Sequence, residues 1–139
     1  MILEETVGIS IGVDVVEISR MSKVCQSNDR FLARVFSERE REYSFRNKVS
    51  PYQHLAACFA AKEAFFKATN ISFAYSEIEV AHERSGKPYF IFSEAVKAKL
   101  VARTADLTIA HEKTVAVCVV VVTDGAAAAA NEKPADGQD

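Results

Sequence analysis

The apolar residues near the start of the chain recur at every second position, which predicts a β-strand within residues 7–18. Small or polar residues occupy the positions between them, so one face of this strand is expected to be buried. The apolar residues of that face are Ile9, Ile11, Val13 and Val15.

Asp14 is out of place in this strand, because aspartate is depleted in strands. One interpretation is that its carboxylate ends the strand and caps the element that follows. The other is that the carboxylate is held at a strand end to bind a hard cation. Gly8 and Gly12 precede it, and their lack of a side chain would let another backbone or a ligand approach closely.

The strongest helix signal covers residues 54–68, where the good helix formers Ala, Lys, Glu and Leu fill most positions. Ser50 is a candidate N-cap, Gln53 is placed to complete a capping box, and Pro51 suits the first turn. Asn70 is expected to end the helix.

The faces of this predicted helix carry different chemistry. Glu63 and Lys67 are four residues apart and therefore share a face, for which the simplest interpretation is a surface ion pair. The same helix carries a row of alanines, whose small side chains would let another helix or a ligand approach the backbone closely. A functional role for Glu63 and Lys67 is therefore the alternative to a surface ion pair. Three large residues recur at helical spacing and should face the core: Leu55, Phe59 and Phe66.

Capping residues predict three short helices before the central one. Four basic residues form a loose cluster along these segments: Arg20, Lys23, Arg30 and Arg34. Most such clusters are solvated faces, and the alternative is a docking surface for an acidic partner. The expected helical segments are residues 21–26, opened by Ser19 or Ser22; residues 30–36, after a break at Asn28 and Asp29; and residues 38–47, with a capping box from Ser37 and Glu40.

Alternating residues separated by turn residues predict two β-hairpins after the central helix. Residues 115–122 are apolar throughout, so this last strand should be buried on both faces, by the core or by a subunit interface. The expected segments are a hairpin of residues 77–82 and 89–92 around the turn 85–88, a helix from Ser93 to about Arg103 with Ala95, Val96 and Leu100 facing inward, and a hairpin of residues 106–111 and 114–123.

Together these elements predict an α+β fold with a mainly antiparallel sheet and a long central helix. At 139 residues the chain is expected to form one domain, which we place at residues 1–123. The segment 124–139 is mostly alanine and polar residues and is expected to be a disordered tail. We find no internal repeat and no Gly-rich phosphate loop of the usual kind.

Composition narrows the functional classes. The net charge of −2 provides no overall field for nucleic acid, so an anionic partner would need a local basic patch. No apolar run has the length of a membrane helix, and the N-terminus has no basic leader before an apolar stretch, so neither a membrane nor a signal peptide is expected. Cys25, Cys58 and Cys118 are odd in number and widely spaced, which favours a reducing cytoplasm over disulfides or a zinc site.

Two motifs in this chain resemble those of the holo-acyl-carrier-protein synthases. They are residues 12–20, Gly-Val-Asp-Val-Val-Glu-Ile-Ser-Arg, and residues 59–68, Phe-Ala-Ala-Lys-Glu-Ala-Phe-Phe-Lys-Ala. Arg30-Phe31, the Gly-Lys-Pro-Tyr run from residue 86 and the strand ending at His111 follow in the order of that family, so the resemblance covers about residues 7–122.

The resemblance implies a 4′-phosphopantetheinyl transferase fold and its activity. Such an enzyme moves the phosphopantetheine arm from coenzyme A to a serine of an apo acyl carrier protein for fatty acid biosynthesis, and releases adenosine 3′,5′-bisphosphate. The small members of the family are homotrimers, with each active site at the seam between two subunits.

The resemblance also implies roles for individual residues. Asp14 and Glu63 match the family's Mg²⁺ ligands, and that ion would offset the charge of the pyrophosphate. Lys67 matches a lysine that meets the phosphates, where it would stabilise the leaving group. Glu63 is the expected base for the carrier serine, acting directly or through a metal-bound water.

Binding of the two substrates is assigned in the same way. Arg20 and Arg30 fall where the family's basic helix meets the acidic carrier protein. His111 matches a family histidine near the nucleotide, with a structural histidine at a strand end as the alternative. The expected contacts to coenzyme A are Lys62, Lys67, Gly86, Lys87, Pro88, Thr108 and His111.

Two departures from the family pattern keep other functions open. Cys58 is small and neutral where many relatives have a basic or aromatic residue, and Ala110 replaces a hydroxyl residue common in relatives. If these changes abolish coenzyme A binding, the chain would be a carrier-binding module without catalysis. A Mg²⁺-dependent phosphodiesterase, which transfers the phosphate to water, is the second alternative.

Overall fold

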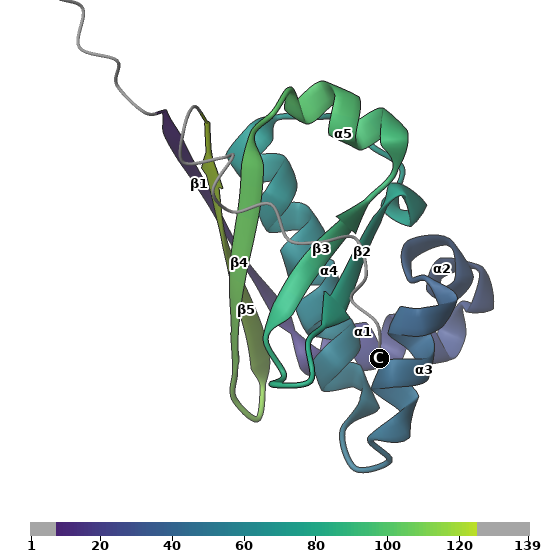
Figure 1. Cartoon of the computed structure of the whole chain (residues 1–139). Helices are drawn as coiled ribbons and strands as arrows, with labels where there is room; N and C mark the ends of the chain where they lie inside the picture. The colour runs from purple at the N-terminus through teal and green to yellow at the C-terminus, as the bar shows by residue number, and fades with distance from the viewer. Residues whose placement is uncertain (1–7, 125–139) are drawn as a thin grey trace, which may run out of the picture.

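The computed structural model describes residues 8–124, which form a three-stranded antiparallel sheet, a long helix and a separate two-stranded hairpin (Figure 1). The larger sheet has the strand order β1-β5-β4 and the smaller one pairs β2 with β3. The predicted tail after residue 124 lies outside the described residues. The elements in chain order are β1 (Ile9–Glu17), α1 (Ile18–Ser27), α2 (Asp29–Val35), α3 (Glu38–Arg46), α4 (Pro51–Thr69), η1 (Tyr75–Glu77), β2 (Ile78–His82), β3 (Pro88–Phe92), α5 (Glu94–Leu100), β4 (Thr104–His111) and β5 (Val115–Thr123).

Helix α4 packs against strand β1 at very short range, because Gly12 has no side chain. A Cβ atom added at Gly12 would overlap the backbone of Ala64 and Ala68. The alanines of α4 are buried, so the helix presents its backbone rather than bulky side chains to the sheet. The close approach predicted from the glycine and from the alanine row is therefore one contact, between β1 and α4.

The ends of α4 match the prediction at Pro51 and Asn70 but not at the capping box. Pro51 begins the helix, and Asn70 ends it in the left-handed conformation with φ 57°, with its amide donating to the Phe66 carbonyl. The capping box expected from Ser50 and Gln53 was wrong, because the Ser50 side chain makes no capping hydrogen bond. The predicted inward face was also partly wrong: Leu55 is buried and Phe59 half-buried, but Phe66 is exposed.

Strand β1 turns the opposite face to the core from the one predicted. Its buried residues are Gly12 and Val16, whereas its four large apolar residues are 50% to 68% exposed. Alternation shows which residues share a face, but the contact with α4 decides which face is covered, and only the glycine face allows that contact. The prediction that Ile9, Ile11, Val13 and Val15 are buried is therefore wrong for the single chain.

Strand β5 continues this exposed surface. Its inner face is buried, but its outer residues are only half-buried, so the prediction of burial on both faces was wrong for the chain alone. In the antiparallel register Val119 lies beside Val13 and Val117 beside Val15, which makes the surface contiguous. We call this surface the outer apolar face, and it consists of Ile9, Ile11, Val13, Val15, Val117, Val119 and Val121.

Local capping signals predicted α3, but the start of α1 expected from Ser19 or Ser22 was wrong, because α1 begins at Ile18 after Glu17 and has no side-chain cap. Ser37 and Glu40 form the expected reciprocal capping box of α3, and the Asn28 side chain caps α2. Helix α5 ends at Leu100, before the predicted Arg103, and Ala95 is exposed rather than inward. At the two ends of the described residues, the Asp124 side chain accepts a 2.6 Å hydrogen bond from the Gly8 amide.

Two predictions from composition can be compared with these described residues. None of their helices is long and apolar enough to cross a membrane. Cys25, Cys58 and Cys118 are free and buried. Burial raises the pKa of Cys25 to about 11 and that of Cys118 to about 12, so both thiols are protonated at neutral pH.

Candidate active site

Asp14 lies in the interior of β1, on the face toward α4, where Lys67 reaches it. The Lys67 ammonium donates to Asp14 Oδ1 and to the Val13 carbonyl, both at 3.0 Å. The Asp14 side chain is 17% exposed and that of Lys67 is 52% exposed. Asp14 neither ends the strand nor caps α1, whose N-cap is Glu17, so the capping interpretation is wrong.

Glu63 is hydrogen-bonded to Tyr75 and is not paired with Lys67, the partner that the four-residue spacing suggested. Its Oε1 atom accepts a 2.6 Å hydrogen bond from the Tyr75 hydroxyl, while Lys67 pairs with Asp14. Within residues 8–124, Glu63 Oε2 and Asp14 Oδ2 have no hydrogen-bond partner. The surface ion pair between Glu63 and Lys67 is therefore not formed, and each carboxylate retains an oxygen for a ligand.

The protonation behaviour of Tyr75 shows that the two carboxylates lie in one neighbourhood. Burial, followed by the hydrogen bond and the charge of Glu63, raises the pKa of Tyr75 to about 12. The charge of Asp14 acts in the same direction, and that of Arg34 opposes it. Because one phenol experiences both acids and a guanidinium, β1, α4, α2 and η1 converge on a single charged site.

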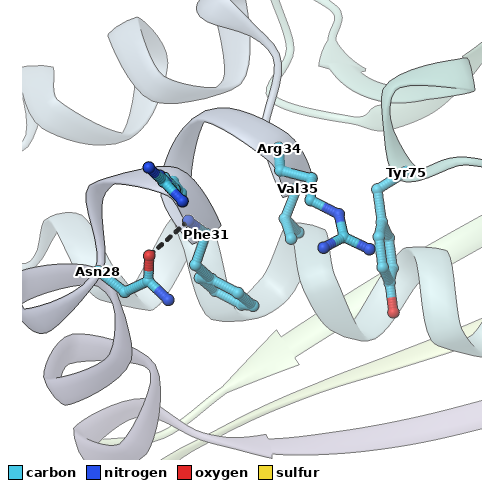
Figure 2. Close-up of a pocket in the computed structure, with 6 residues that line it drawn as sticks. Asn28, Phe31, Arg34, Val35 and Tyr75 are labelled. Atoms are coloured by element: carbon cyan, nitrogen blue, oxygen red, sulfur yellow. Dashed lines mark hydrogen bonds between the residues drawn. The ribbon is translucent and has the colours of Figure 1, made fainter.

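A pocket of about 370 Å³ opens beside this site (Figure 2). Figure 2 shows the Arg34 guanidinium next to the Tyr75 ring, and the hydroxyl of the same tyrosine donates to Glu63. Arg30, one of the two predicted docking arginines, also lines this pocket, together with Tyr75. The remaining lining residues are Asn28, Phe31 and Val35.

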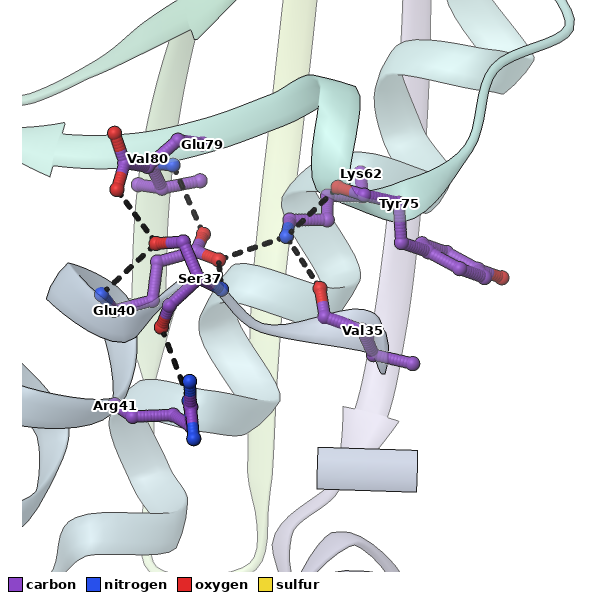
Figure 3. Close-up of polar contacts among 8 residues, drawn as sticks. All are labelled: Val35, Ser37, Glu40, Arg41, Lys62, Tyr75, Glu79 and Val80. Carbon is purple, nitrogen blue, oxygen red and sulfur yellow. Dashed lines mark hydrogen bonds and ion pairs between the residues drawn. The ribbon is translucent and has the colours of Figure 1, made fainter. Parts of the chain in front are cut away.

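Lys62 does not lie where a phosphate could meet it (Figure 3). Its side chain is fully buried, and its ammonium donates to Val35 O at 2.6 Å, Glu40 Oε1 at 2.8 Å and Tyr75 O at 3.3 Å. An ammonium has three donors, and all three are used here. The expectation that Lys62 contacts coenzyme A does not fit this placement, because the Lys62 ammonium is paired with the buried Glu40 carboxylate.

Four of the other predicted coenzyme A contacts, Gly86, Lys87, Pro88 and His111, form a second group at the N-terminal end of α4. His111 lies within reach of Gln53, with 2.5 Å between Gln53 Nε2 and His111 Nδ1. Gly86 and Lys87 form the turn of the β2–β3 hairpin, and Pro88 pairs with His82 as β3 begins. Gly86 has φ +91°, a conformation that favours glycine.

Thr108 does not join this second group. It is exposed on β4 beside Val119, in the same row as Val13, and so lies next to the outer apolar face. His111 is three residues further along the strand and therefore points to the opposite side of the sheet. One chain alone does not bring Thr108 and His111 together.

Two features of the site escaped sequence reasoning. Tyr75 lies twelve residues after Glu63, and no pattern connects a tyrosine in a short 3₁₀ turn with a helical glutamate. Cys58, which raised doubt about a phosphate contact, is buried beside Glu40 and Lys62. Its environment raises the thiol pKa, first by burial and then through Glu40, so this position belongs to the core.

Comparisons with known proteins agree on one family. Residues 10–120 match the family model of the 4′-phosphopantetheinyl transferase superfamily. A holo-[acyl-carrier-protein] synthase of Caldanaerobacter subterraneus is 32% identical over 123 residues, covering 84% of this chain and 96% of that protein. A protein of the same name from Chlamydia trachomatis is 37% identical over 116 residues, covering 80% and 96%.

Solved structures show the same fold. The holo-(acyl-carrier-protein) synthase of Bacillus anthracis in complex with coenzyme A (3′,5′-ADP) matches with a TM-score of 0.70 and 31% identity, covering 84% of this chain and 96% of that one. The enzyme–coenzyme A complex of Chronobacterium ammoniagenes matches with a TM-score of 0.75 and 28% identity, covering 83% and 96%. The similarity therefore spans nearly all of each solved structure and more than four-fifths of this chain.

Proposed function

This chain belongs to the 4′-phosphopantetheinyl transferase superfamily, and we propose that Asp14 and Glu63 form its Mg²⁺ site. Its activity is that of a holo-[acyl-carrier-protein] synthase in fatty acid biosynthesis. It transfers the 4′-phosphopantetheine arm from coenzyme A to a serine of the apo carrier protein and releases adenosine 3′,5′-bisphosphate.

The donor set fits a magnesium ion. Mg²⁺ favours one or two carboxylates together with phosphate oxygens and waters, and two carboxylates are what the site offers. Residues 8–124 contain no cluster of three or more His, Cys, Asp or Glu side chains with metal-site geometry, which would suit a zinc site better. When bound, the ion supplies positive charge that offsets the pyrophosphate of coenzyme A.

The side chains around the acidic pair have separate tasks in this proposal. Glu63 takes the proton from the carrier serine, directly or through a water, as the serine oxygen attacks the β-phosphorus. The bond from that phosphorus to the leaving 3′,5′-bisphosphate oxygen breaks at the same centre. Lys67 has one donor left beyond Asp14 and Val13, and that donor meets the phosphate that gains charge.

Tyr75 keeps Glu63 in place for this task. Its hydroxyl holds Oε1 and leaves Oε2 free for the ion or for the serine proton. The Tyr75 ring is itself fixed, because it stacks on Phe59 with 5.8 Å between ring centroids. A carboxylate held at one oxygen by a packed phenol loses little freedom when it binds.

The two substrates approach from different sides. The carrier protein docks on Arg20 and Arg30, because acidic partners are steered to such a patch. Coenzyme A is held by the second group of residues, which comprises Gly86, Lys87, Pro88 and His111, with Thr108 from the outer side of the sheet. We also propose that the protein acts in the cytoplasm, where its three free thiols would stay reduced.

The working enzyme in this proposal is a homotrimer. Contiguous apolar surfaces of this size mark interaction sites, and the outer apolar face has no cover within residues 8–124. His54, at the second group, and Glu63 are nine residues apart on α4, which is two and a half helical turns, so they project to opposite sides. An assembly that covers the outer apolar face would bring the second group of one subunit to the acidic pair of another.

Light scattering tests the assembly. We expect a mass three times the 15.3 kDa of one chain. Ile11→Asp should give monomers, because a carboxylate in the centre of the interface cannot be desolvated without a partner. Val49→Asp is the matched control, since Val49 is 95% exposed and lies outside this face. A trimeric Ile11→Asp variant would show that subunits meet elsewhere.

The observation that carries the proposed site is the convergence of Asp14 and Glu63 from separate elements, made possible by Gly12. The test is to incubate the protein with coenzyme A, Mg²⁺ and an apo carrier, and to weigh the carrier by mass spectrometry. We expect the carrier to gain the arm in wild type and not in Glu63→Gln. Cleavage of coenzyme A without gain would support a phosphodiesterase, and co-purification alone would support a binding module.

A further inference from the structure

Phe66 of α4 stands apart from the other phenylalanines of the chain. Each of those packs against another aromatic ring. Phe66 makes no such ring contact within residues 8–124, and it is 43% exposed. An aromatic side chain left in water gains nothing from its apolar area, so its position on the molecule decides whether it is available to a ligand. The proposed activity gives Phe66 no task.

Phe66 lies on the face of α4 that carries the active site. It follows Glu63 by three residues and Lys67 follows by four, and residues at these spacings are neighbours, with about 5–6 Å between their Cβ atoms. Three residues are slightly less than a helical turn and four are slightly more, so Phe66 and Lys67 flank Glu63 on opposite sides. Lys67 is on the side of β1, because it donates to Asp14 and to the Val13 carbonyl. Phe66 is therefore on the side away from β1.

The same side of α4 is apolar one turn earlier, where it is covered. Phe59 precedes Phe66 by seven residues and therefore shares its side of the helix. Tyr75 stacks on the Phe59 ring with 5.8 Å between ring centroids, and the Phe31 ring lies at 6.3 Å. No ring of the described residues covers Phe66 in this way. The apolar side is therefore open just beyond Glu63.

The chemistry of coenzyme A supplies a group for this open position. The β-phosphorus carries the leaving oxygen, two charged non-bridging oxygens and the ester oxygen of the arm. The charged oxygens face the ammonium of Lys67, on the side of β1, and the serine attacks in line with the leaving oxygen. The ester oxygen and the arm therefore point away from β1. The carbon after the first methylene of the arm bears two methyl groups, so an apolar group follows directly on the reacting phosphate.

We propose that Phe66 is a specificity-determining residue whose ring contacts the geminal dimethyl group of the phosphopantetheine arm. The inference rests on the proposed function, because the reaction at Glu63 sets the direction of the arm. The contact removes apolar area from water, which favours this arm over one without the two methyl groups. The contact is at the phosphate end of the arm, so it does not distinguish coenzyme A from acetyl-coenzyme A.

Calorimetry without a carrier protein measures the contact. The full chain with Mg²⁺ is titrated with coenzyme A, with an analogue that has hydrogens in place of the two methyl groups, and with adenosine 3′,5′-bisphosphate, which has no arm. We expect a Kd for the analogue about tenfold above that for coenzyme A. Phe66→Ser should make the two values equal by weakening coenzyme A alone, and Phe66→Leu should restore most of the difference. The Kd for the bisphosphate should be the same in all three proteins.

Phe45→Ser is the matched control. Phe45 is 41% exposed, close to the value for Phe66, but it lies at the end of α3, and its ring meets Tyr52 edge-on at 6.0 Å between centroids. This variant should keep the wild-type ratio between the two Kd values. If Phe66→Ser does not fold, the wild-type protein still decides, because equal Kd values for coenzyme A and the analogue would overturn the inference.

Two further measurements identify other occupants of this position. A lower mass of Phe66→Ser in light scattering, with the Kd ratio unchanged, would show that another subunit covers the ring. A carrier KM that rises in this variant equally with both donors, again with the Kd ratio unchanged, would show that the carrier covers it. Either result would overturn the inference.

Arm transfer to the carrier is measured separately, by mass spectrometry at saturating coenzyme A. Transfer by the wild-type protein together with equal Kd values for coenzyme A and the analogue would reject only the contact of Phe66 with the arm. A tenfold Kd ratio that depends on Phe66, without any transfer, would reject only the proposed function.

Discussion

Two lysines five residues apart on α4 have opposite fates, and the contrast separates structure from function in this protein. Lys62 and its partner Glu40 are both fully buried, and every donor of the ammonium is used. Lys67 is half exposed beside Asp14, with a donor to spare. Residue type and helix are the same in both cases. The role follows from burial and from the hydrogen-bonding capacity that remains.

The buried pair of Lys62 and Glu40 connects structural elements and is not part of the active site. Glu40 accepts from the Ser37 amide at 2.8 Å and from the Val80 amide at 2.9 Å, so it joins α3, α4 and β2 (Figure 3). Lys62 adds the carbonyls of Val35 and Tyr75. Through Tyr75 this junction also fixes the phenol that holds Glu63. The structural region therefore supports the catalytic one without touching substrate.

The largest effect is expected from the acidic pair. Glu63→Gln or Asp14→Ala should lower Mg²⁺-dependent kcat by at least about 10³-fold, because charge that offsets the transferring phosphate is lost. Stability should change by no more than about 1 kcal/mol, since Asp14 and Lys67 form a partly exposed pair. Turnover and chemical denaturation measure the two quantities. Wild-type rates in either variant would contradict the metal assignment.

Matched substitutions of the two lysines test the comparison itself. Lys62→Met should lower the free energy of unfolding by about 3–5 kcal/mol, because it leaves Glu40 buried without its counter-ion. Lys67→Met should cost no more than about 1 kcal/mol and reduce kcat by about 10²–10³-fold. Adding Glu40→Gln to Lys62→Met should recover part of the lost stability in urea titrations. If Lys62→Met and Lys67→Met had equal free energies of unfolding, the distinction between a structural and a catalytic lysine would be wrong.

A smaller effect is expected at Tyr75, where the two regions meet. Tyr75→Phe removes only the hydroxyl that holds Glu63 Oε1, so divalent-ion affinity should fall about tenfold. Electron paramagnetic resonance of bound Mn²⁺ measures this affinity without any need for turnover. Tyr52→Phe, also on a half-buried tyrosine, is the control. Unchanged Mn²⁺ affinity would show that the phenol only fills space.

The smallest effect is expected outside both regions, at the docking surface. Arg20→Glu should raise the KM for the carrier about two- to fivefold, the scale of exposed charge pairs, and leave the KM for coenzyme A unchanged. The difference from wild type should shrink as salt is added. A carrier KM that does not move would remove Arg20 from the docking surface.

Much of the secondary structure could be predicted because its signals are local. The capping box of Ser37 and Glu40 and the left-handed stop at Asn70 depend on contacts within a few residues. The turn containing Gly86 and the hairpin partners of β2 and β3 follow in the same way. The exposed outer apolar face could not be predicted, because alternation defines two faces without saying which one meets a helix.

For the site, the sequence by itself determined the candidates: the motifs around Asp14 and Glu63 gave the family and the chemistry of the acidic pair. Only the tertiary structure decided that Lys62 is internal, that Tyr75 holds Glu63, and that His54, His82 and His111 meet. The physical reason is that residue type sets what a group can bind. How much water and how many partners surround that group depends on elements that are distant along the chain.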